Sequence, residues 1–232
     1  MNQIEIRELS DKLLYDNTVI LNYSIQYPQI INSRYSFGQR IFNMYNQKIA
    51  FDLQKYIKTE LFNDAKSVYE YNKANGFPLM VYEVILKYNI TRNNNYIVSL
   101  YSDEYMYTGG AHGSTIRKGQ TWDLRNGRML PLQYFYPNDS YYLINILKSI
   151  NFQIKQQIEQ EGEGIYFDNY CELILETFKL ENFYVFNNFA EVFFQQYDIA
   201  PYSSGIPTFK ISFWEYKCKN KTQKCNCISA FC

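Results

Sequence analysis

The residues best suited to chemistry or recognition lie in the stretch Tyr107-Thr-Gly-Gly-Ala-His-Gly-Ser114, which holds His112, the only histidine of this 232-residue chain. A neutral imidazole can act as a base, a metal ligand or a hydrogen-bonding group for a ligand. Its neighbours Gly109, Gly110 and Gly113 permit positive φ angles and close backbone approach to a ligand or to another segment. Two interpretations stay open. The stretch is a functional loop, or it is a tight connection in which His112 holds the loop through a carbonyl.

Catalysis at His112 would need a partner group within hydrogen-bond reach. The sequence neighbours that could serve are Asp103, Glu104, Ser114, Thr115 and Asp123. No nucleophile elbow precedes the serine, a hydrolytic zinc site uses three protein ligands, and the loop lacks the Gly-Lys-Ser/Thr ending of a phosphate loop. Two carboxylates suffice for glycoside hydrolysis, but no spacing here supports that reaction. We therefore expect no catalytic residue and no cofactor, which leans against an enzyme.

The cysteines divide into one internal residue and a C-terminal group. Cys171 lies in an apolar segment and is predicted to be a small buried side chain. The group beside several lysines comprises Cys218, Cys225, Cys227 and Cys232. Four thiolates could hold zinc, but the usual two-residue spacing is absent. We expect no metal site, and the alternative to zinc is a solvated tail with reactive thiols.

Composition limits the classes of partner. Lys plus Arg equals Asp plus Glu, so the chain lacks the basic field of a general nucleic-acid binder. The 24 tyrosines and 17 phenylalanines suit half-wet sheet faces and binding surfaces. Residues 134–136 and 141–142 are aromatic and could form a platform for sugars or pack a helix entry onto a sheet. The first ten residues hold no apolar leader region, and no apolar run reaches the length of a membrane span. On sequence alone, we therefore predict either a cytoplasmic protein or one from which a leader has been removed.

Apolar periodicity predicts the elements that position the loop. In the N-terminal half we expect strands at 4–7, 18–27, 80–90 and 96–107, with Pro28 ending the second. A helix capped by Ser36 is predicted over about 37–74, with a break near 59–64 and an end at Asn75-Gly76. In the C-terminal half we expect a hairpin of 120–124 and 129–132 around a type I′ Asn126-Gly127 turn, helices at about 139–161 and 170–177, a hairpin of 183–186 and 189–194, and a strand at 206–213.

Helices alternating with antiparallel hairpins predict an α+β fold. We expect two adjoining small domains, each with an antiparallel or mixed sheet packed by one or two amphipathic helices. The predicted boundaries are residues 1–113 for the N-terminal domain, 114–214 for the C-terminal domain and 215–232 for a tail rich in cysteine and lysine.

Several motifs carry a resemblance to known proteins. The stretch Tyr107–Gly113 is followed by Thr121-Trp122-Asp123-Leu124, by Asn126-Gly127 and by Tyr197-Asp-Ile-Ala-Pro-Tyr202. This order resembles a bacterial family of unknown function, and Tyr27-Pro28-Gln29 before a long helix resembles the domain that usually precedes it. Such domain pairs resemble the ectodomain of lysozyme-sensing anti-sigma factors. They also resemble the non-catalytic N-terminal region of some peptidoglycan deacetylases, and this family is mostly extracytoplasmic.

The resemblance implies a non-catalytic recognition module that binds a cell-wall-related protein of the lysozyme type, or a cell-wall glycan. The candidate binding residues are Tyr107, Gly109, Gly110, His112, Gly113, Trp122, Asp123 and Tyr202. The alternative is a cell-envelope polysaccharide hydrolase or deacetylase accessory with a site near His112, and a third reading is a purely structural module. We expect no nucleic acid and no membrane span, and the sequence leaves the oligomeric state open.

Overall fold

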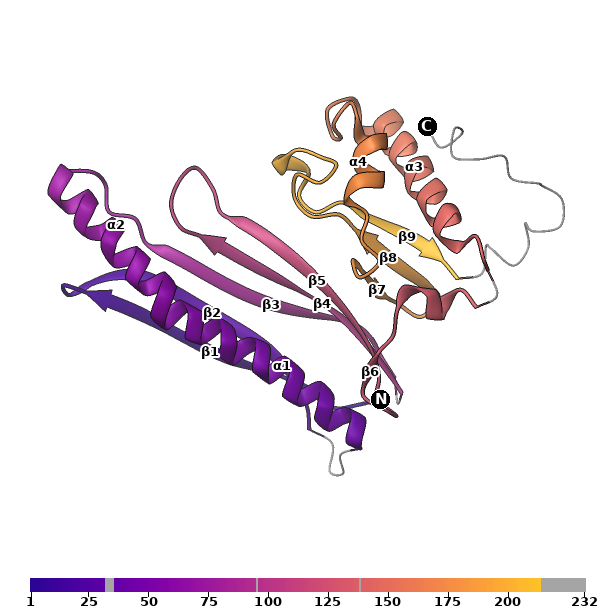
Figure 1. The fold of residues 1–232 in the computed structure, drawn as a ribbon, viewed down its shortest axis with the longest axis horizontal. Helices are drawn as coiled ribbons and strands as arrows, with labels where there is room; N and C mark the ends of the chain where they lie inside the picture. The colour runs from indigo at the N-terminus through magenta and orange to yellow at the C-terminus, as the bar shows by residue number, and fades with distance from the viewer. Residues whose placement is uncertain (32–35, 95, 138, 214–232) are drawn as a thin grey trace. The chain divides into compact units, whose positions relative to one another are not determined.

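The computed structural model describes residues 1–31, 36–94, 96–137 and 139–213, so the predicted tail and its four cysteines lie outside the described residues. The fold is α+β, as predicted (Figure 1). A larger sheet has the strand order β1-β2-β3-β4-β5-β6, and a smaller sheet has the order β7-β8-β9. No described helix combines the length and the apolar character needed to cross a membrane.

The strands are β1 (Ile4–Tyr15), β2 (Thr18–Ile30), β3 (Tyr82–Asn93), β4 (Ile97–Tyr107), β5 (Ser114–Asp123), β6 (Arg128–Met129), β7 (Phe183–Val185), β8 (Phe189–Phe193) and β9 (Thr208–Ser212). The α-helices are α1 (Phe37–Tyr56), α2 (Phe62–Asn75), α3 (Tyr142–Glu161) and α4 (Tyr170–Thr177). A π-helical turn, η1 (Ile57–Leu61), joins α1 to α2, and two short 3₁₀ turns are η2 (Leu132–Phe135) and η3 (Tyr202–Ser204).

The chain forms two compact units. The first comprises Met1–Ile116 and Trp122–Arg128, and the second comprises Arg117–Thr121 and the described residues from Met129 onward. Strand β5 therefore gives its ends to the first unit and its centre to the second. The predicted domain boundary between residues 113 and 114 stays a prediction.

The first hairpin of the first unit is longer than the sequence pattern indicated. Strand β1 continues to Tyr15 and meets β2 through a two-residue turn, in which Asp16 and Asn17 have φ angles of 48° and 57°. Two positive φ angles are what a type I′ turn requires, and Asx residues tolerate them. The expectation that Pro28 ends the next strand was wrong. Pro28 lies opposite Ile6 of β1, and β2 pairs with β3 only from Leu21 to Ile25, so a proline here removes no bond to β3.

A long helical crossover connects β2 to β3, which pair in parallel. Parallel neighbours need such a connection, and α1, η1 and α2 supply it. The predicted cap is confirmed, because Ser36 accepts from the Gln39 N–H while the Gln39 side chain accepts from the Ser36 N–H. The predicted break is the π-helical turn. Gly76 ends the helix with a φ of 68°, as expected of a C-terminal glycine.

The helices cover one face of the first sheet (Figure 1). Alternate residues of β3, from Tyr82 to Tyr88, are buried on that face with Phe42, Ile57 and Leu61 of the helical segment. Strands β3 and β4 pair antiparallel, as predicted, with a bulge between Ile90 and Arg92. This hairpin carries the stretch Tyr107–Ser114 at its end.

In the second unit, α3 and α4 share one apolar core with β7, β8 and β9. The hairpin of β7 and β8, the helix at 170–177 and the last strand agree with the predictions. Cys171 is half-buried rather than buried, with its sulfur 3.8 Å from Asn151 Oδ1. Helix α3 begins at Tyr142, three residues later than expected, because Asp139 accepts from the Tyr141 N–H in the preceding turn.

The aromatic stretch at residues 134–136 packs rather than forming an open platform. Tyr136 is buried, and its hydroxyl donates to the Ile211 carbonyl at 3.2 Å. The Phe135 ring stacks on Phe213 with centroids 5.1 Å apart. Both rings therefore attach the entry of α3 to β9, whereas Tyr134 is 47% exposed.

Candidate functional site

The stretch Tyr107–Ser114 is an exposed connection between β4 and β5. The Tyr107 hydroxyl donates to the Gly110 carbonyl at 3.1 Å, which closes the loop on itself. Gly109 and Gly110 have φ angles of 107° and 89°, which L-residues rarely adopt. His112 is exposed, and its Nδ1 lies 3.0 Å from the carbonyl oxygen of Gly113. The imidazole therefore engages the backbone of its own loop.

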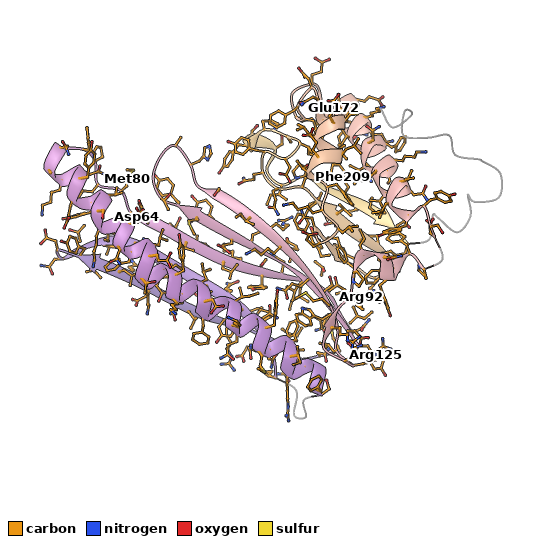
Figure 2. The ribbon with its side chains drawn as sticks, in the orientation of Figure 1. Asp64, Met80, Arg92, Arg125, Glu172 and Phe209 are labelled. Carbon is orange, nitrogen blue, oxygen red and sulfur yellow. The ribbon has the colours of Figure 1, made fainter. Side chains whose placement is uncertain are left out.

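At two of the three loop glycines, an added Cβ would lie close to other atoms of the protein. A Cβ on Gly113 would lie 2.5 Å from the Tyr105 ring and 2.6 Å from the Met106 carbonyl. A Cβ on Gly109 would lie 3.2 Å from the sulfur of Met80, which Figure 2 labels. Around Gly110, by contrast, no atom would lie within 4 Å of such a Cβ. Close packing thus explains Gly113, and backbone conformation explains Gly110.

Two candidate residues from the motif that follows have structural contacts. Trp122 is buried in the first unit, with its ring 5.7 Å from Phe42 and 5.2 Å from Tyr45. Asp123 is also buried and accepts from Arg125 Nη2 at 2.7 Å and from Arg125 Nε at 2.9 Å. The guanidinium hydrogen bond, which outweighs the cost of burial, lowers the pKa of the Asp123 carboxyl from its ordinary value.

The same aspartate organises the turn between β5 and β6. Its carbonyl accepts from the N–H groups of Asn126 and Gly127, at 3.3 and 2.8 Å. Gly127 has a φ of 70°, whereas Asn126 keeps a negative φ. The predicted type I′ turn is therefore wrong, because that turn needs positive φ at both central residues. The extra hydrogen bonds to Asp123 favour a longer turn.

Tyr202 belongs to the second unit. It opens η3 after Pro201, is half-buried, and its ring centroid lies 5.9 Å from that of Tyr197. The nearby Asp198 accepts from the Gln195 N–H at 2.8 Å. Burial raises the pKa of the Asp198 carboxyl above its ordinary value. Tyr202 thus stands on a loop held by backbone contacts.

A polar surface adjoins the loop in the first unit. On β3 and β4, the residues that alternate with the helix-facing ones are cross-strand partners: Glu83 with Tyr107, Ile85 with Tyr105, Lys87 with Asp103 and Asn89 with Tyr101. In the same rows, Asn22 and Ser24 of β2 lie opposite Lys12 and Ser10 of β1. We call these twelve residues the polar face. All of them are half-buried or exposed.

The polar face was not predicted as a site. Its signal is in the sequence, because polar residues and tyrosines alternate with the apolar residues of β3 and β4. What the sequence could not supply is the register that aligns Tyr101, Tyr105 and Tyr107 on one face, with Tyr105 and Tyr107 beside the loop. Tyr107 belongs to both features, and the Tyr105 ring contacts Gly113. The loop and the polar face therefore form one continuous candidate surface.

The side chains of this surface could take part in recognition of a polar partner. Tyrosine hydroxyls, amides, hydroxyls and charges of both signs can bond a polar partner, and the rings offer contact area. Within the described ranges, no group of three or more His, Cys, Asp and Glu side chains is placed to hold a metal ion.

Two parts of the chain each match a family model. Residues 135–213 match the family model described as Protein of unknown function (DUF3298). The predicted resemblance to a bacterial family of unknown function is confirmed for residues 135–213, whereas the signature at Tyr107–Gly113 and the resemblance to anti-sigma factors stay predictions. Residues 15–115 match a second family model, described as Deacetylase PdaC. No curated protein matches the chain.

Two crystal structures share the fold. A DUF3298 family member from Bacteroides fragilis superposes with a TM-score of 0.70 at 16% identity, over 94% of this chain and 92% of that one. A DUF3298 family protein from Pseudomonas aeruginosa gives a TM-score of 0.59 at 13% identity, over 91% of this chain and 92% of its own. At these identities the likeness concerns the fold.

Proposed function

We propose that this protein is a non-catalytic recognition module for a component of the cell envelope. The partner is a wall-related protein of the lysozyme type or a peptidoglycan glycan. The matched family models support an envelope role, since one is described as a deacetylase and the other occurs here as its neighbour in the same chain. The resemblance to lysozyme-sensing ectodomains supports the choice of partner.

The observation that carries the proposal is the exposed surface formed by the His112 loop and the adjoining polar face. The His112 Nδ1 lies 3.0 Å from the Gly113 carbonyl oxygen, which holds the ring on its loop, and the motif carboxylate Asp123 accepts from Arg125. The exposed ring next to the tyrosines of the polar face suits a hydrogen-bonding contact in a binding surface.

The second candidate is an accessory with hydrolase or deacetylase activity near His112. The description of the family model over residues 15–115 favours it. In this candidate, His112 would act together with a carboxylate or hydroxyl, because the imidazole alone cannot complete the reaction.

Substitution of surface residues tests the proposal. We expect His112→Ala and Tyr101→Ala each to weaken binding to immobilised lysozyme or to peptidoglycan fragments about tenfold, because such truncations remove more than about 1 kcal/mol at a binding hot spot. Tyr71→Ala is the matched control, since Tyr71 is 63% exposed on α2. Equal binding by all three variants, with unchanged melting temperatures, would contradict the assignment of the surface.

A further inference from the structure

The second unit contains a hollow of about 520 Å³. It lies where the end of α3, the loop that follows, η3 and the start of β9 meet. The polar residues around it are Gln157, Glu161, Tyr166, Ser203, Ser204 and Thr208. Its volume falls within the range of about 300–1,000 Å³ typical of small-molecule sites. Such sites are mostly apolar, however, so the polar lining here indicates a polar ligand.

The walls of the hollow are held in place. The Tyr166 hydroxyl donates to Gln157 Oε1, and its ring lies against Phe209, which Figure 2 labels, with centroids 6.5 Å apart. The Ser204 hydroxyl donates to the Ile165 carbonyl at 2.8 Å, and the Phe167 N–H donates to the Ile199 carbonyl at 3.1 Å. These bonds tie the loop after α3 to both η3 and the core, so the hollow is pre-formed.

The charge around the hollow is negative. Glu161 is the last residue of α3, where unpaired carbonyls give the helix end a partial negative charge. Among the described residues that line the hollow, none is Lys or Arg. Burial, followed by the charge of Glu161, raises the pKa of Tyr166 to about 12, so the phenol stays protonated at neutral pH. An anionic ligand would be repelled, whereas a ligand that presents hydroxyl donors would be favoured.

We propose that this hollow binds an uncharged sugar unit of a glycan. Hydroxyls of the sugar donate to the Glu161 carboxylate and exchange hydrogen bonds with Ser203 and Thr208, while Tyr166 supplies aromatic surface for the sugar ring. The inference deepens the proposed function, on which its choice of a wall glycan rests. It adds a site in the second unit to the surface of the first.

Binding of short oligosaccharides to the full chain tests the proposal. The probes are tetramers of N-acetylglucosamine and of glucose, which are uncharged, and of galacturonic acid, which is anionic. Binding is measured by calorimetry and by saturation-transfer NMR. We expect an uncharged tetramer to bind and the anionic one to fail. Glu161→Gln should weaken the binding about tenfold, because it replaces a charged hydrogen-bond acceptor with a neutral one.

The matched control is Glu159→Gln, an exposed residue of the same helix that does not line the hollow. Thr208→Val is a second variant, expected to weaken the tetramer less than Glu161→Gln does. Absence of binding by both uncharged tetramers at millimolar concentration would overturn the inference. Equal losses for Glu159→Gln and Glu161→Gln would overturn it as well.

The two proposals fail in different ways. If the protein does not retain peptidoglycan although a tetramer binds in a Glu161-dependent manner, the proposed binding surface around His112 is wrong and the proposed sugar site in the hollow is supported. If the protein retains peptidoglycan through His112 but neither uncharged tetramer binds, the proposed sugar site in the hollow is wrong and the proposed surface around His112 is supported.

Discussion

Asp123 shows how a residue that resembles part of a functional motif can stabilise a turn. Its carboxylate is buried and accepts from the Arg125 side chain and from the Arg125 N–H. We predict that Asp123→Asn lowers the free energy of unfolding by about 1–3 kcal/mol at neutral pH, the usual cost of a lost charged hydrogen bond. Asp52→Asn, which removes an exposed pair with Lys48, should cost less than about 0.5 kcal/mol.

The pH dependence of this difference follows from the pKa. The pKa of the Asp123 carboxyl is lower in the folded protein than its ordinary value in the unfolded chain. Its contribution to stability is therefore complete at pH values above the unfolded-state pKa and is lost as the pH falls through the folded-state pKa. The stability gap between the wild type and Asp123→Asn should therefore be full at pH 7 and shrink below about pH 4. Urea unfolding across this range measures it. A gap that grows on acidification would contradict the role of the ion pair.

The candidate site could be predicted in part at the residue scale. The exposed His112 loop followed from the glycines and from the resemblance. The burial of Trp122 and Asp123 did not, because burial depends on tertiary packing. A part for either residue in ligand binding stays a prediction.

At the scale of elements, the start of α1 is attached to the turn after β5. The Ser36 hydroxyl accepts from the Gln39 N–H and also donates to the Leu124 carbonyl at 3.0 Å. We predict that Ser36→Ala destabilises the protein by about 1–2 kcal/mol, because it removes a helix cap and a tertiary bond together. Ser36→Asp, which keeps the cap and loses the donor, should recover part of this loss in thermal unfolding. No recovery would contradict the capping role.

The centre of β5 crosses close to β7 within the second unit. A Cβ on Gly119 would lie 1.9 Å from the Phe183 carbonyl oxygen, and the Gln195 side chain bonds both the N–H and the carbonyl of Arg117. We predict that Gly119→Ala costs about 3 kcal/mol or more, because backbone must move to admit the methyl group. Lys155→Ala, on the exposed face of α3, should stay within about 0.5 kcal/mol. Similar melting temperatures for the two variants would contradict this close crossing.

Helices and strands were predicted correctly where the apolar periodicity agrees with the residues that cap or end an element. Ser36, Gly76 and the apolar stripe between them define the long helix well. The length of the first strand was underestimated because Glu8, Ser10 and Asp11 break the alternation of polar and apolar residues. In the structure, this strand continues to Tyr15 because it pairs with β2 across the Asp16-Asn17 turn. Strand β2 continues past Pro28 because pairing partners, which a single sequence does not show, decide where proline is tolerated.

For the whole molecule, α+β layering and mixed sheets could be predicted, whereas the path of β5 could not. That strand belongs to the first unit at both ends and to the second at its centre. Such a path depends on contacts between residues far apart in sequence, including Arg117 with Gln195.

The central claim is recognition without catalysis, and one experiment measures both. Purified protein is incubated with purified peptidoglycan, and with immobilised lysozyme, while retention and the release of acetate or reducing ends are recorded together. We predict retention by at least one partner at micromolar protein, reduced by His112→Ala, with no product above the level of a protein-free control. Release of acetate or reducing ends that His112→Ala abolishes would contradict the account and make the protein an enzyme.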